Sequence, residues 1–130
     1  MRVVIVEDSR LARLELCEQL SQLPNVTLVG QADTVESATA LIDEVQPDLI
    51  LLDIDLPGGT GFDLLEQLEV LPKVVFTTAF DEFAVRSFEV DALDYLLKPI
   101  TLPRLTKALA KAEAQLAAQE AVTTESRLHG

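Results

Sequence analysis

Residue types that mark whole classes of protein are scarce in this sequence. Its 130 residues include a single cysteine, Cys17, so neither an internal disulfide nor a cysteine-rich zinc site can form. Lysine and arginine number 10 against 22 aspartates and glutamates, whereas holding a nucleic-acid backbone requires clustered basic side chains. No apolar run approaches the roughly 20 residues of a membrane-spanning helix. We therefore expect a chain that binds neither nucleic acid nor a membrane directly.

The residues that are present fit one compact, acidic domain. A length of 130 residues suits a single domain, and 48% hydrophobic residues suffice for a core. The formal net charge of −12 predicts an acidic, well-solvated surface. The first residues form a strand-like run rather than a secretion signal, and cysteine is nearly absent, so we expect a cytoplasmic protein.

Short apolar segments alternate with helical patterns along the chain. The apolar run at residues 49–52 shows no polar alternation, which is typical of a strand covered on both faces. The expected strands are residues 3–6, 26–32, 49–52, 73–78 and 94–97. The helices expected after them, with their caps, are near residues 9–23, 33–46, 61–68, 81–90 and 101–118. This alternation predicts an α/β fold, a doubly wound parallel sheet of five strands with helices on both faces.

Three local features of the helices can also be predicted. The apolar stripe expected to face the core in the first helix is Leu11, Leu14, Cys17 and Leu20. Asp33 and Glu36 have the spacing of a capping box before the second helix. The apolar pattern of the last helix fades near Gln119. We therefore expect one domain at residues 1–118, followed by a tail or linker at residues 119–130.

Polar residues stand at the carboxyl ends of four of the expected strands. They are Glu7 and Asp8 after the first, Asp53 at the third, Thr77 and Thr78 at the fourth, and Lys98 at the fifth. In a parallel sheet these ends share one edge, where open α/β sheets keep their binding sites. Carboxylates gathered there repel one another unless a cation intervenes. Because only oxygen ligands are available, the sequence favours a hard cation such as Mg²⁺.

Asp53 ends the central strand, where an aspartate can be a metal ligand, a nucleophile or a helix cap. Beside a metal ion, Lys98 and the Thr78 hydroxyl could hold a phosphoryl group, whose transfer depends mainly on positioning and charge stabilisation. Thr77 is a competitor for the role of Thr78. A carboxylate nucleophile that forms an aspartyl phosphate is established chemistry, and this makes Asp53 the candidate phosphoryl acceptor.

Together these residues resemble the receiver domain of two-component response regulators. The matching positions are Glu7-Asp8, Asp53, Pro57, Gly61, Thr78-Ala79, and Tyr95 with Lys98-Pro99. The resemblance covers roughly residues 1–118 and implies the flavodoxin-like (βα)5 fold with strand order 2-1-3-4-5. Residues 76–84 and 92–100 further resemble receivers of the LytTR (LytR/AlgR) type. In that type the receiver precedes a DNA-binding domain, and these 130 residues contain no match to one.

The resemblance implies how a phosphoryl group would be received. Asp53 would accept it from a sensor histidine kinase, and Thr78 and Lys98 would contact its oxygens. Thr78 and Tyr95 would form the switch pair that moves on phosphorylation, and the Lys98–Pro99 peptide bond would be cis. The chain would then not be an enzyme acting on a separate substrate. It would phosphorylate itself from small donors with Mg²⁺ and lose its own phosphate slowly.

The resemblance also implies a metal site and an output. Mg²⁺ would be bound by the carboxylates of Asp8 and Asp53, by the backbone carbonyl of Asp55 and by Glu7 through water. Phosphorylation would change the surface formed by residues 81–90, the strand at 94–97 and the last helix, and so control transcription through the absent output domain. Apolar residues expected on that surface are Phe83, Phe88, Val90 and Leu93. They suggest a symmetric homodimer.

Two alternatives stay open at this point. Asp53 and Asp55 also resemble the DxD motif of phosphohydrolases that form an aspartyl phosphate, in which the second aspartate is a general acid. That reading leaves Glu7 and Asp8 unexplained, and such enzymes usually carry the motif near the N-terminus. The other alternative is a stand-alone receiver that controls a protein partner.

Overall fold

The computed structural model describes the backbone of residues 1–80 and 91–129 and the side chains of residues 1–80 and 91–120. The helix expected at residues 81–90 lies outside the described residues. The same holds for Phe83, Phe88 and Val90, three of the residues expected on the output surface. The fourth of them, Leu93, is half-buried beside the core.

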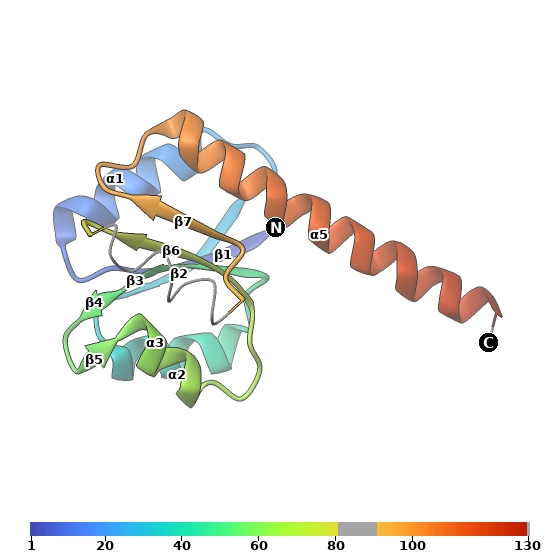
Figure 1. Cartoon of the computed structure of the whole chain (residues 1–130), viewed down its shortest axis with the longest axis horizontal. Helices are drawn as coiled ribbons and strands as arrows, with labels where there is room; N and C mark the ends of the chain where they lie inside the picture. The colour runs from blue at the N-terminus through green and yellow to red at the C-terminus, as the bar shows by residue number, and fades with distance from the viewer. Residues whose placement is uncertain (81–90, 130) are drawn as a thin grey trace.

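The centre of the fold is a five-stranded parallel sheet (Figure 1). The strands are β1 (Arg2–Val6), β2 (Thr27–Ala32), β3 (Leu49–Asp53), β6 (Lys73–Thr78) and β7 (Asp94–Leu97). They lie in the order β2-β1-β3-β6-β7, which confirms the predicted doubly wound topology. Every neighbouring pair is parallel, so all five carboxyl ends meet at one edge.

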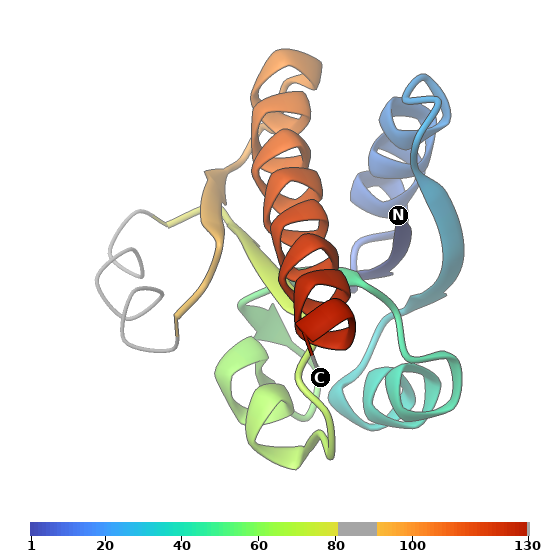
Figure 2. The ribbon, with the colours of Figure 1, turned by 90° about the vertical axis from the view of Figure 1, so that its right-hand side faces the viewer.

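Helices cover both faces of the sheet (Figure 2). On one face lie α1 (Arg10–Ser21) and α5 (Leu102–His129), and on the other lie α2 (Val35–Val45) and α3 (Gly61–Gln67). The buried strand β3 serves both layers, because Leu49 and Leu51 pack toward α1 and α5, while Ile50 and Leu52 pack toward α2 and α3. A slip of one residue would exchange these two sets, so the register that places Asp53 is strongly specified.

The side of α1 that faces the core differs from the prediction. Leu16 and Leu20, one turn apart, are buried, whereas Leu11 and Leu14 are 68% and 55% exposed. The predicted stripe was therefore wrong for Leu11 and Leu14. At about 3.6 residues per turn these two leucines lie on the side of α1 opposite to Leu16 and Leu20. Apolar residues occur on both sides of this helix, and spacing alone did not say which side is inside.

The N-terminus of α2 is capped one residue later than predicted. The Thr34 hydroxyl accepts from the Ser37 N–H at 3.0 Å, and the Ser37 hydroxyl accepts from the Thr34 N–H at 3.2 Å. This reciprocal pair is the capping box of α2, so the predicted pair of Asp33 and Glu36 was wrong. Two overlapping pairs of residues have the spacing of a capping box, and the structure uses Thr34 and Ser37, whose side chains carry hydroxyls.

Helix α5 is longer than the sequence suggested. It runs without a break to His129, so residues 119–129 continue the helix. Its side chains at residues 117–120 are exposed, and Figure 1 shows α5 leaving the body of the domain. The predicted boundary near residue 118 falls inside this helix and stays a prediction. In the part of the chain that the structure describes, no helix has both the length and the apolar character needed to cross a membrane.

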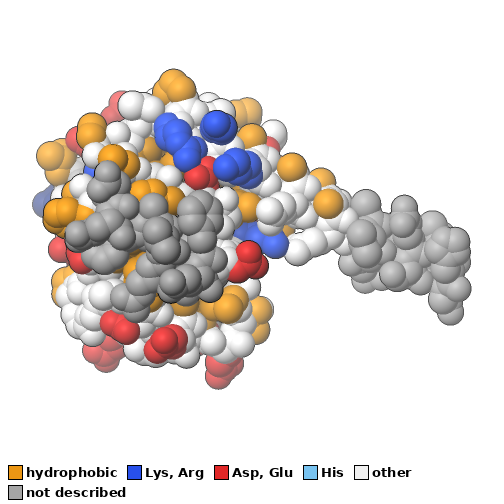
Figure 3. Space-filling model, in the orientation of Figure 1, with side chains coloured by type: hydrophobic (Ala, Val, Ile, Leu, Met, Phe, Trp, Pro, Cys, Tyr) orange, Lys and Arg blue, Asp and Glu red, His pale blue; other side chains and the backbone are white. Residues whose placement is uncertain are grey.

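A carboxylate at the start of β7 fastens α5 to the sheet. Asp94 accepts from Arg104 at 2.7 and 3.0 Å, from Lys111 at 3.3 Å and from the Tyr95 N–H at 2.8 Å. Figure 3 shows Lys and Arg side chains gathered where α5 passes over β7. Burial by itself raises the pKa of Asp94, but these hydrogen bonds and positive charges outweigh burial and lower the pKa to about 2.

We predict that Asp94→Asn lowers the free energy of unfolding at pH 7 by about 1–2 kcal/mol, a figure reduced because Arg104 and Lys111 are partly exposed. Because the folded pKa lies below the unfolded value, this contribution is present above about pH 4 and fades as the pH falls toward 2. Urea unfolding at several pH values measures it. The exposed neighbour Asp91 provides a control. An equal loss for Asp91→Asn would contradict the role of Asp94 in fastening α5 to the sheet.

Candidate functional site

The loop after β1 carries the first two acidic residues of the site. Glu7 is fully buried and Asp8 is exposed. The Glu7 N–H donates to the Ala32 carbonyl at 3.0 Å, which ties the loop to β2. Arg13 of α1 donates to the carbonyls of Glu7 and Asp8 at 2.8 and 3.4 Å. Sequence analysis missed Arg13, because its partners are backbone carbonyls, which every residue has.

The loop after β3 holds Asp53 by its backbone. Asp53 is 4% exposed, and its Oδ1 accepts from the Asp55 N–H at 3.2 Å. The chain then forms a short hairpin of β4 (Asp55–Leu56) and β5 (Gly59–Thr60). The N–H of Gly61 returns to the Ile54 carbonyl at 2.7 Å. A Cβ on Gly61 would lie 2.8 Å from the Asp53 carbonyl oxygen, so this close return requires glycine.

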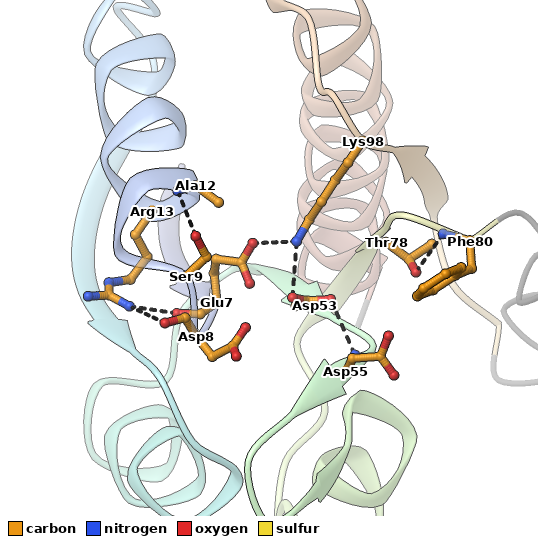
Figure 4. Close-up of polar contacts among 10 residues, drawn as sticks. All are labelled: Glu7, Asp8, Ser9, Ala12, Arg13, Asp53, Asp55, Thr78, Phe80 and Lys98. Carbon is orange, nitrogen blue, oxygen red and sulfur yellow. Dashed lines mark hydrogen bonds and ion pairs between the residues drawn. The ribbon is translucent and has the colours of Figure 1, made fainter.

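The strand ends bring the predicted acidic residues together (Figure 4). Glu7, Asp8 and Asp53 each offer one carboxylate oxygen, and these oxygens all lie within 4.8 Å of one another. Lys98, which follows β7, reaches across the edge of the sheet. Its Nζ lies 3.1 Å from Asp53 Oδ2 and also contacts Glu7 Oε1. Residues separated by up to 91 positions in the sequence therefore form one cluster, with a lysine between two buried carboxylates.

The electrostatics of this cluster are unbalanced. Burial raises the pKa of Glu7, the neighbouring Asp53 carboxylate raises it further, and the contact with Lys98 offsets only part of this. Burial lowers the pKa of Lys98, but its contacts with Glu7 and Asp53 outweigh burial, and the net pKa is raised. Three carboxylates against one ammonium leave an excess of negative charge that one divalent cation could neutralise.

The donor set fits a hard cation. The ligands that the described residues offer here are carboxylate and carbonyl oxygens, which suit Mg²⁺ better than a softer metal. Glu7 Oε2 is buried and has no hydrogen-bond partner among the described residues, so a metal-bound water would satisfy it. Asp55 behaves differently, because its carboxylate is exposed and Figure 4 shows it turned away from Asp53. Only the backbone of Asp55 remains a candidate ligand.

The two predicted switch residues meet at the backbone of Phe80. Thr78 is fully buried, and its Oγ1 accepts from the Phe80 N–H at 3.1 Å. The hydroxyl of Tyr95, which is half-buried, donates to the Phe80 carbonyl. Thr77, the competitor of Thr78, is also buried and lies opposite Asp53 in the ladder between β3 and β6. Consecutive strand residues face opposite sides of a sheet, so Thr77 and Thr78 cannot serve the same face.

The segment that carries Lys98 continues the register of the sheet. The Lys98 N–H donates to the Thr78 carbonyl at 2.7 Å, so its backbone is fixed beside the end of β6. The Lys98–Pro99 peptide bond is cis, as the resemblance implies. The hydrogen bond to Thr78 places Lys98 at the carboxyl ends of the strands, where its ammonium contacts Glu7 and Asp53.

With this geometry in view, comparison with known proteins identifies the family. Residues 3–110 match the response regulator receiver domain family. The chain belongs to this family. A solved response regulatory domain of protein mrkE from Klebsiella pneumoniae has a TM-score of 0.80 and 35% identity, and the match covers 88% of this chain and 97% of that one. This receiver domain therefore has the fold that its sequence predicted.

Similar curated sequences are regulators about twice as long. An uncharacterized response regulatory protein of Shewanella oneidensis is 43% identical over 118 residues, which cover 89% of this chain and 50% of that protein. The sensory transduction protein LytT of Bacillus subtilis is 42% identical over 114 residues, which cover 85% of this chain and 47% of LytT. The receiver domain thus spans about half the length of these relatives. The name of the second relative, LytT, confirms the resemblance to LytTR-type receivers.

We predict that Lys98→Met lowers the stability of the metal-free protein by about 2 kcal/mol or more, because two buried carboxylates lose their common cation. Urea unfolding in EDTA measures this. Mg²⁺ should restore part of the loss, since it can replace the missing charge. Lys107→Met changes an exposed lysine of α5 and serves as the control. If both variants unfold alike, Lys98 does not neutralise the cluster.

Proposed function

We propose that this receiver domain accepts a phosphoryl group on Asp53 and passes the signal to a transcriptional output. The observation that carries the proposal is the convergence of Glu7, Asp8 and Asp53 on Lys98 at one edge of the sheet. Asp53 is buried, ends the central strand and has a lysine against one carboxylate oxygen. That is the setting in which a carboxylate can act as a nucleophile toward phosphorus.

In the proposed reaction an Asp53 oxygen attacks phosphorus, and the donor departs as a neutral histidine of a sensor kinase or as acetate. Mg²⁺ held by Asp8, Asp53 and the Asp55 carbonyl, with Glu7 acting through water, would offset the carboxylate charge so that an anionic donor can approach. Lys98 would turn its ammonium from the carboxylates to the phosphoryl oxygens. Thr78 would donate its hydroxyl to another of these oxygens. Slow self-hydrolysis would return Asp53 to its free state.

The kinase partner is proposed from the family and from the surface beside the site. Receiver domains take phosphoryl groups from histidine kinases, and α1 presents Leu11 and Leu14 to solvent next to the acidic loop. Two large, exposed leucines on one helix are typical of a contact surface. A transcriptional output is supported by the resemblance to LytTR-type receivers, a type in which the receiver precedes a DNA-binding domain.

The phosphohydrolase alternative receives less support. In such an enzyme the second aspartate of the DxD motif must reach the leaving group as a general acid. The Asp55 carboxylate is exposed and turned away from Asp53 (Figure 4). The role of Asp55 proposed here needs only its backbone.

The central test is intact-mass measurement after incubation with acetyl phosphate and Mg²⁺. The wild type should gain one phosphoryl group and Asp53→Asn none, and EDTA should abolish the gain. Asp43→Asn changes an aspartate of α2 and should label normally. Labelling of Asp53→Asn equal to wild type would exclude Asp53. Continuous turnover of a generic phosphomonoester would favour the phosphohydrolase instead.

We further propose that phosphorylation promotes a homodimer through β7, α5 and residues 81–90. A phosphoryl group would draw Thr78 toward Asp53, and this movement would reach Tyr95 because both side chains bind the backbone of Phe80. Exposed apolar side chains at Phe80 and Leu97, 51% and 47% exposed, offer contact area near this surface.

The dimer is tested by sedimentation with beryllofluoride and Mg²⁺, which mimic the phosphoryl group. The dimer fraction should rise in the wild type, and Thr78→Ala should blunt the rise while Mg²⁺ binding persists. An unchanged mass distribution at saturating analogue would show that the signal is read by another domain or partner.

A further inference from the structure

One side chain outside the carboxylate cluster makes an unusual contact. Gln19 of α1 donates from Nε2 to the Ile100 carbonyl at 2.9 Å, a bond between residues 81 positions apart. Its Oε1 is buried and accepts no hydrogen bond from the described residues. A buried acceptor without a partner disfavours folding and offsets part of what the Nε2 hydrogen bond contributes to stability. No pattern in the sequence pointed to this residue.

The bond between Gln19 and Ile100 holds the backbone two residues after Lys98. At Lys98 itself, the N–H donates to the Thr78 carbonyl at 2.7 Å, which fixes the backbone to the end of β6. Pro99 has no N–H to contribute and is exposed. After Pro99, Gln19 holds the Ile100 carbonyl. Lys98 is therefore bracketed by one anchor in the sheet and one on α1.

The second anchor, the bond between Gln19 and Ile100, lies beside a cleft that Lys98 also lines. A cleft of about 330 Å³ separates α1 from this segment, and its lining includes Glu7, Leu16, Gln19, Lys98, Pro99 and Ile100. On one side of this cleft Ile100 packs against the core that Leu16 and Leu20 of α1 help to form. The Gln19 hydrogen bond ties the backbone of the same segment to α1. Figure 4 shows Lys98 crossing from this segment toward Glu7 and Asp53.

We propose that Gln19 is a positioning residue for phosphoryl transfer, which holds the Lys98–Ile100 segment so that the Lys98 ammonium stays over Asp53. The inference rests on the proposed function. Phosphoryl transfer depends on the placement of charged groups within fractions of an ångström, so a supporting residue can change its rate without touching the phosphoryl group. Helix α1 then acts as a brace, because it joins the acidic loop at its N-terminus to the lysine segment near its C-terminus.

The test compares Gln19→Met with wild type. Methionine has a similar shape and removes both the donor and the unpaired acceptor, so the melting temperature should change by less than about 3 °C. Phosphorylation by acetyl phosphate should slow about three- to tenfold. The Mg²⁺ dissociation constant should stay within about twofold, because no carboxylate is altered. The NMR signals of Lys98 Cε and its protons should move toward those of an exposed lysine.

Two further variants show whether the donor is responsible. Gln115→Met makes the same change on the exposed side of α5 and should behave as wild type. Gln19→Lys keeps a donor within reach of the Ile100 carbonyl and should retain more than about half of the wild-type rate. If Gln19→Lys is as slow as Gln19→Met, the shape of glutamine matters rather than its donor, and the proposal is wrong.

Other outcomes separate this inference from the proposed function. A wild-type rate in Gln19→Met with unchanged Lys98 signals would overturn the positioning role. A rate loss matched by an equal loss of Mg²⁺ affinity would also overturn it, because the defect would then lie at the carboxylates. If the wild type takes up no phosphoryl group on Asp53, the proposed function fails, and the Lys98 signals still report whether Gln19 positions the lysine.

Discussion

Two buried carboxylates at the edge of the sheet impose the constraint on which the site depends. Glu7 and Asp53 are held out of water close to Asp8, and Lys98 is the cation between them. Carboxylates in such a place are unfavourable unless positive charge stays near. The cluster is therefore stabilised by a nearby cation, which can be the Lys98 ammonium alone or the ammonium together with a metal ion. Because of this dependence, binding of a charged ligand would change the balance of charge in the site.

The rest of the fold supplies the rigidity that such a cluster needs. Cores on both faces of the sheet fix β1, β3 and β6 in register, so the strand ends cannot move apart. Local contacts then set individual side chains. Arg13 holds the acidic loop, Gly61 lets the chain return beside Asp53, and Gln19 ties α1 to the lysine segment. Much of the support for the site thus comes from backbone carbonyls rather than from the reacting groups.

A path from the site to the surface also runs through backbone contacts. Thr78 and Tyr95 both bind the backbone of Phe80, and Tyr95 follows Asp94, whose carboxylate fastens α5. Arg104 binds both the Asp94 carboxylate and the Tyr95 carbonyl, the latter at 3.3 Å. A shift of Tyr95 would therefore change the contacts of Arg104 and so affect α5, which leaves the domain as a long helix. This arrangement offers a physical link between the site and α5.

The sequence alone determined the sheet, its helices and the set of polar strand ends. Unbroken apolar runs and 3.6-residue periodicity are local signals, and parallel topology sends every strand end to one edge. The sequence did not determine which side of α1 is buried, which residues cap α2, or that residues 119–129 are helical. The contacts of Arg13 and Gln19 also came only from the tertiary structure. Each joins a side chain to a backbone carbonyl, and a carbonyl leaves no trace in residue identity because every residue has one.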